Sequence, residues 1–135
     1  MNREERLKKS FLEEIQGKTM VSKARAKDLL DEERQDEANF EKIKTNVYDI
    51  FEKMFNISYK NIYSAKNQAN TDREKYQLLE VEFLKFLEKI PAPWKQKAIK
   101  DKEHGLIEDL IIEELKISTA EEIRDLFQHK YEKFQ

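Results

Sequence analysis

The sequence has very few of the residues that β-sheet proteins use in their tight turns. Its 135 residues include only two glycines and two prolines. Strands joined by tight turns need glycine, proline and β-branched residues at many positions, whereas good helix formers such as Glu, Lys, Leu and Ala are abundant here. We therefore predict an all-α fold, a helical bundle of about five to seven helices.

The composition also indicates a compartment. Without cysteine the chain can form no disulfide and no thiolate metal site. The N-terminal stretch MNREERLKKS is charged where a secretory signal would have an apolar run. Acids interrupt even the most apolar stretch, GLIEDLIIEELKI, which is also too short to cross a bilayer. We expect a cytoplasmic protein that does not span a membrane.

The N-terminal third has an uneven apolar pattern. A first helix would present Leu7, Phe11, Leu12 and Ile15 on one face and end near Gly17. Ser22 would cap a long, partly exposed second helix, which crosses residues 31–39 without a large apolar side chain. We predict a helical arm over residues 1–36 that contributes little to the core, and a bundle core over residues 37–135, in one structural domain overall. Alternatively, residues 31–39 form a joint between arm and bundle.

The sequence TDRE predicts where a later helix begins. In this capping box Thr71 accepts from the amide of Glu74 while the Glu74 side chain reaches back. A helix over residues 72–89 follows, and Pro91 ends it. An unbroken coiled coil is the alternative, because apolar residues recur at every seventh position. These residues are Ile62, Ala69, Tyr76, Phe83 and Ile90.

The C-terminal third predicts three more helices. A short basic helix begins near Pro93 and closes near Gly105. Residues 106–115 are apolar around most of a helix circumference, so this helix is expected at the centre of the bundle or in an oligomer interface. Ser118 or Thr119 would cap the last helix. The broad apolar surface over residues 106–115 leads us to expect a homodimer.

Charge is balanced overall but uneven along the chain. There are 26 basic and 28 acidic side chains, whereas residues 28–41 hold seven acids and one Arg. We interpret the chain as a non-enzymatic protein that acts through protein–protein interaction, in a regulator, inhibitor or immunity-like role. The acidic segment predicts a protein partner with a basic surface. The partner-binding candidates are Asp28, Asp31, Glu32, Asp36 and Glu37.

A basic segment supports a different function class. Four lysines and a tryptophan between residues 94 and 102 could bind nucleic acid by combining charge with base stacking. These residues are Trp94, Lys95, Lys97, Lys100 and Lys102. The near-neutral total charge makes nucleic acid the less favoured partner.

The last helix carries a short pattern that resembles a catalytic signature. Arg124, Asp125, His129 and Tyr131 follow the order R-D-x-x-x-H-x-Y. This resembles the signature of HEPN-type ribonucleases and their toxin relatives, small all-α domains that cleave RNA in a dimer cleft. The resemblance implies metal-independent cleavage, with His129 in general acid-base catalysis, Arg124 neutralising phosphate charge and Tyr131 as a modifiable tyrosine.

Geometry weakens the catalytic interpretation. Five residues along a helix turn the side chain by about 140°, so Arg124 and His129 are expected to diverge. The chain also lacks glycine-rich phosphate loops, a nucleophile elbow and a recognisable metal-ligand spacing. We therefore expect no catalytic site, no metal and no cofactor.

Overall fold

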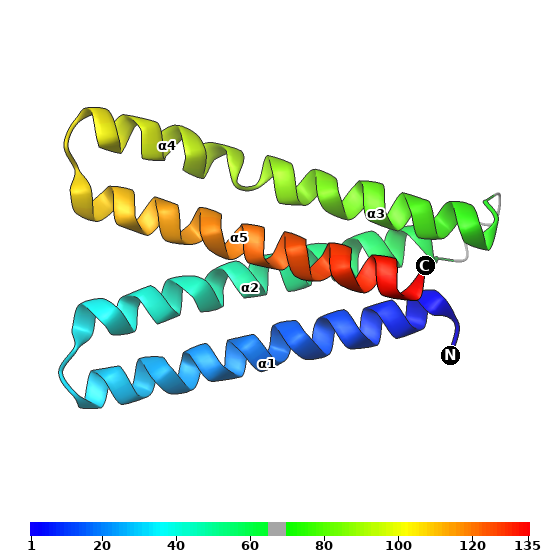
Figure 1. Cartoon of the computed structure of the whole chain (residues 1–135), viewed down its shortest axis with the longest axis horizontal. Helices are drawn as coiled ribbons and strands as arrows, with labels where there is room; N and C mark the ends of the chain where they lie inside the picture. Colours follow the sequence, from blue (N-terminus) through cyan, green and yellow to red (C-terminus); the bar gives the residue numbers. More distant parts are fainter. Residues whose placement is uncertain (65–69) are drawn as a thin grey trace.

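The computed structural model describes residues 1–64 and 70–135, and all regular structure in these residues is helical. The segments are α1 (Arg3–Asp31), α2 (Gln35–Ile62), α3 (Asp72–Lys89), α4 (Ala92–Glu103) and α5 (Ile107–Phe134). Figure 1 shows α3 and α4 following one another along one edge, so the segments form an elongated bundle of four rods. The predicted all-α class is confirmed. The count of five to seven separate helices is not, because α3 and α4 make up one rod.

The predicted long second helix is wrong, because the chain reverses direction within the acidic stretch. Glu33 adopts a left-handed backbone conformation with φ of 62°. The Arg34 amide donates to the carbonyl of Leu29 at 2.8 Å, and the Glu32 amide donates to that of Asp28 at 3.1 Å. Residues 32–34 thus form the turn of an α-helical hairpin. Residues 31–39 have no large apolar side chain because they contain this turn. They form neither an exposed helix nor a joint to an arm.

Two predicted helix ends also lie inside helices. α1 runs through Gly17 and Ser22 without a break. Similarly, α5 runs through Ser118 and Thr119, whose hydroxyls donate to the carbonyl of Leu115 instead of capping a new helix. A serine or threonine can satisfy its hydroxyl within a helix as well as at its start, so the residue type alone does not fix a boundary.

Other boundaries agree with the predictions. Thr71 and Glu74 form the predicted capping box, and α3 begins at Asp72. Because α2 ends at Ile62, the alternative unbroken coiled coil is wrong; Ala69, which it placed in the core, lies outside the described residues. Pro91 separates α3 from α4, and Gly105, at φ of 69°, lies in the turn between α4 and α5.

Residues 1–36 contribute directly to the core, so the prediction that they contribute little is wrong. Leu7, Phe11 and Ile15 are all 0% exposed. The Phe11 ring lies 4.9 Å from that of Phe55 on α2 and 5.6 Å from that of Phe127 on α5, measured between centroids. The short apolar stripe of α1 is therefore matched by aromatic residues of the other rods. That match is invisible when α1 is considered alone.

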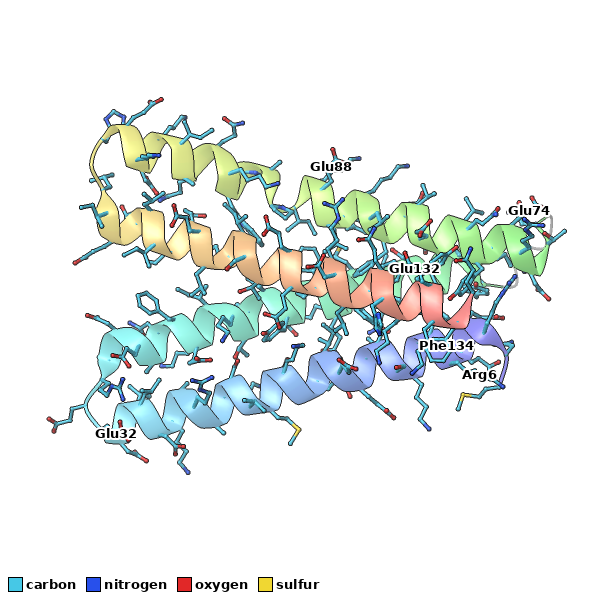
Figure 2. The ribbon with its side chains drawn as sticks, in the orientation of Figure 1. Arg6, Glu32, Glu74, Glu88, Glu132 and Phe134 are labelled. Carbon is cyan, nitrogen blue, oxygen red and sulfur yellow. The ribbon has the colours of Figure 1, made fainter. Side chains whose placement is uncertain are left out.

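The filled core occupies only one half of the bundle. We call the end that holds both termini proximal and the end with turns 32–34 and 104–106 distal; Arg6 and Phe134 mark the first and Glu32 the second (Figure 2). The main apolar cluster fills the proximal half and ends at the middle of the bundle. Its residues are Leu7, Phe11, Ile15, Val47, Tyr48, Phe51, Phe55, Ile62, Tyr76, Leu79, Phe83, Leu87, Ala120, Ile123, Phe127 and Tyr131.

The distal half consists of two helical hairpins with little between them. One is the end of α1 with the start of α2, and the other is α4 with the start of α5 (Figure 1). The buried apolar side chains in these segments are only those of Ala26 and Ala38. The helix over residues 106–115, expected to be covered on several sides, leaves Ile107 69% and Ile111 44% exposed. It is not central in the monomer.

Tyr76 ties α3 to the end of α5 at the proximal end. Its hydroxyl donates to the Tyr131 carbonyl at 2.8 Å in a buried hydrogen bond, and the two rings stack with centroids 4.3 Å apart. That carbonyl lies in the last turn of α5, where carbonyls lack partners within the helix. Tyr76 therefore acts as a tertiary cap.

We expect Tyr76→Phe to lower the free energy of unfolding by about 1–2 kcal/mol, because it leaves this buried carbonyl unsatisfied. Urea denaturation measures the change. Tyr48→Phe is the control: the Tyr48 hydroxyl donates to Glu122 at 3.1 Å, and Lys18 would still pair with that carboxylate at 2.8 Å. Equal losses in both variants would contradict the capping role.

Candidate partner-binding cleft

A cleft of about 160 Å³ lies between the two distal hairpins. α2 supplies one wall and α5 the other. The cleft stays open because no large buried side chain fills the space between the two hairpins. The lining residues are Asp36, Asn39, Phe40 and Ile43 from α2, and Glu108, Ile111 and Ile112 from α5. The cleft combines an apolar floor with an acidic rim.

The floor of the cleft is incompletely covered. Phe40, Ile43 and Ile112 are half-buried, and Ile111 is exposed. Burying apolar area is worth roughly 25 cal/mol per Å², so these side chains offer favourable contact to an added apolar group. In the sequence they resemble core residues, because a half-buried and a buried position have the same helical spacing. The sequence therefore gives no signal that distinguishes them from core residues.

The predicted acidic segment lies beside this cleft but does not fill it. All five partner-binding candidates, Asp28, Asp31, Glu32, Asp36 and Glu37, are exposed near the α1–α2 turn. Arg34 pairs with Glu32 and with Glu37. Of the five, only Asp36 lines the cleft, where Glu108 accompanies it from α5. The structure thus brings one candidate together with a residue that the sequence did not single out.

Charged side chains hold each distal hairpin together internally. Between α4 and α5, Lys97 lies 3.8 Å from Glu113, and Lys97 also pairs with Asp101 on its own helix at 2.9 Å; both carboxylates are buried. Between α1 and α2, Glu41 lies 3.9 Å from Arg25. These pairs bring opposite charges together without supplying apolar area between the hairpins. The hairpins therefore hold together internally while the space between them stays open.

The predicted nucleic-acid segment lies on α4, with part of it already engaged. Lys97 is paired with Asp101, and Trp94 is half-buried with the Lys116 ammonium 5.9 Å from its ring centroid. Lys95, Lys100 and Lys102 are exposed. A stacking platform needs an open aromatic face, so these residues offer charge but no free tryptophan.

The residues of the ribonuclease-like pattern do not converge. Arg124 lines a hollow with Leu87 and Lys95, toward the α3–α4 rod. His129 is exposed on the side of α1, next to Lys130, whose hydrogen bond to Glu14 is the main cause that lowers the pKa of that carboxyl. Tyr131 is buried in the core. An acid-base pair for phosphate chemistry needs both groups within reach of one substrate, and the monomer does not provide this.

Burial affects the tyrosines in a way that can be measured. Burial raises the pKa of every tyrosine in the chain and is the main cause of the increase in each case. The tyrosines are Tyr48, Tyr59, Tyr63, Tyr76 and Tyr131. In the unfolded chain tyrosine ionises near the ordinary pKa of about 10. The folded state therefore keeps its full tyrosine contribution to stability below that pH and loses it as the pH rises toward the folded pKa values.

We expect tyrosinate to form together with loss of helix in an alkaline titration. Ultraviolet absorbance reports tyrosinate and circular dichroism reports helix, and the two curves should coincide above pH 10. A peptide of residues 54–64, which is too short to fold, serves as control and should ionise near the ordinary pKa. Ionisation near pH 10 in a fully helical protein would contradict the burial of these hydroxyls.

Within residues 1–64 and 70–135, no three His, Asp or Glu side chains are grouped so that they could hold a metal ion. No helix in the described part of the chain is long and apolar enough to cross a bilayer. The sequence matches no known protein-family profile, no curated protein and no solved structure. The cleft is therefore the feature of the molecule that bears most directly on its function.

Proposed function

We propose that this chain is a non-enzymatic protein that acts by binding another protein at the cleft between its distal hairpins. The observation that carries the proposal is the unequal filling of the bundle. The proximal half buries rings such as Phe11, Phe83 and Phe127 completely, whereas the distal half leaves Phe40, Ile111 and Ile112 partly open. An open apolar surface flanked by polar residues is typical of protein interaction sites.

A regulator, inhibitor or immunity-like role is consistent with this proposal, since each acts by occupying a surface of another protein. The absence of cysteine favours a reducing compartment such as the cytoplasm, which is the location we propose. Neither the divergent Arg124 and His129 nor the partly engaged α4 lysines favour a second function.

The experiment is affinity capture from cells of the source organism, followed by mass spectrometry. Wild type is compared with Ile111→Asp, which puts a charge into the cleft, and with Val81→Asp, which makes the same change at a similarly exposed position on α3. Ile111 is 44% and Val81 49% exposed. We expect a partner that wild type and Val81→Asp retain and Ile111→Asp loses. A partner retained equally by all three would contradict a role for the cleft.

Self-association is a separate prediction about the same end of the molecule. The homodimer expected from the apolar residues 106–115 would depend on exposed side chains such as those of Leu106 and Ile107, which do not line the cleft. Light scattering of the purified protein measures the mass directly. A monomer at high concentration would contradict the homodimer, and either mass is compatible with the binding of another protein in the cleft.

A further inference from the structure

We infer that the occupant of the distal cleft is an amphipathic helix of another protein, which inserts one large apolar side chain and places Lys or Arg beside it. The inference rests on the proposed function and specifies the chemistry of the partner. It combines the shape of the cleft, the charge of its lining and the charge of the molecule's own distal end.

The shape of the cleft fits a helix. Its walls come from residues 36–43 of α2 and 108–112 of α5, so the cleft extends over about two helical turns. A third helix packs naturally into the groove between two neighbouring helices, and helix-in-groove recognition uses apolar anchors on one face. The volume of about 160 Å³ is comparable to cavities that hold a benzene-sized group. One Phe or Leu side chain would occupy it.

The charge of the cleft favours a basic partner. Asp36 and Glu108 stand on opposite walls, and no Lys or Arg is among the lining residues. The lysines nearest in sequence on α2 belong to other surfaces: Lys42 lines a groove with Lys23 and Leu30, and Lys44 pairs with Glu41. Opposite charges at an interface fix the register of a partner and increase its association rate.

The same charges disfavour a second copy of this chain as the occupant. Residues 28–41 hold seven acids and one Arg, and residues 103–114 hold five acids and no Lys or Arg. A second copy that inserted its own distal end into the cleft would bring two such acidic ends together, and like charges placed across an interface are destabilising. A basic helix replaces this repulsion with attraction.

Two labelled peptides serve as probes. One is a helix of about 18 residues with a Leu face, a central Phe and Lys on its flanks, and the other has Glu in place of every Lys. Fluorescence anisotropy with the full-length protein measures each affinity. We expect the Lys peptide to bind at least about tenfold more tightly than the Glu peptide, with the difference shrinking at high salt.

Matched variants locate the binding surface. We expect Ile111→Asp to weaken binding of the Lys peptide at least about tenfold, and Val81→Asp to leave it unchanged. The double variant Asp36→Asn with Glu108→Gln should weaken it about three- to tenfold. Asp36 and Glu108 also lie in the first turns of their helices, where acids stabilise a helix. The double variant Glu5→Gln with Asp72→Asn removes two first-turn acids at the proximal end and is therefore the control for helix stability.

Thermal melts show whether each variant is folded, and Ile111→Ser with Val81→Ser is a milder pair should Ile111→Asp unfold. Equal binding of the two peptides, or equal effects of the Ile111 and Val81 variants, would overturn the inference. No peptide binding would overturn it as well. A different result would contradict the proposed function, namely a captured partner that Ile111→Asp retains as well as wild type does. The two failures are therefore distinguishable.

Discussion

A chain that begins at Gln35, without α1, is expected to show no cooperative thermal unfolding. Removing α1 takes Leu7, Phe11 and Ile15 out of the core, and all three are completely buried. Each large apolar side chain lost from a core costs about 2–5 kcal/mol, and a domain of this size is stable by only about 5–15 kcal/mol. The remaining helices would keep an exposed aromatic face. Differential scanning calorimetry measures whether a transition remains.

Complementation provides the control for this truncation. A separate peptide of residues 1–34 should restore the transition, because α1 packs against α2 and α5 without a covalent requirement for the turn at 32–34. The same peptide with Leu7, Phe11 and Ile15 replaced by serine should not restore it. A cooperative transition in the truncated chain alone would show that residues 1–34 are a dispensable arm after all.

The second large effect is expected from a single substitution in α1. Phe11→Ala should lower the free energy of unfolding by about 3–5 kcal/mol, because it leaves a cavity among the rings of Phe55, Phe83 and Phe127. Val21→Ala on the same helix is the control, and its 58% exposed side chain should make the change less than about 0.5 kcal/mol.

Urea denaturation at one temperature gives both values. A loss below about 1 kcal/mol for Phe11→Ala would contradict the central place of this ring in the core. Equal losses in the two variants would show that burial does not determine the effect, since helix propensity favours alanine at both positions.

Local signals in the sequence determined several features correctly. The scarcity of glycine and proline predicted the all-α class, and the pair Thr71 and Glu74 located the start of α3. Pro91 and Gly105 marked the ends of segments. Each of these features depends on the chemistry of residues within a few positions, namely a missing amide proton, a left-handed conformation or a side-chain cap.

The errors concern features that depend on distant parts of the chain. The turn at residues 32–34 has no Gly, Pro or Asn to mark it, and Glu33 takes the left-handed conformation instead. The apolar stripe of α1 seemed too short to matter because its partners, such as Phe55 and Phe127, lie far along the chain. Gly17 lies inside α1 because tertiary packing outweighs the modest cost of glycine in a helix.

The cleft was beyond prediction for a related reason. Phe40, Ile43 and Ile112 have the spacing of core residues, and the sequence does not show that the opposite wall stops short of them. The acidic segment was recognised as a partner-binding candidate, yet Asp36 gains its place in the cleft only through Glu108 on α5. Two segments about seventy residues apart had to be placed in space first.

Amide hydrogen exchange tests the unequal filling of the bundle most directly. Slow exchange through global unfolding is expected for proximal amides, such as those of Phe51, Phe83 and Phe127, because their surroundings are fully buried. Faster exchange through local opening is expected in residues 21–31, 36–43 and 107–116. Uniform protection along all four rods would contradict an open distal half and, with it, the proposed binding site.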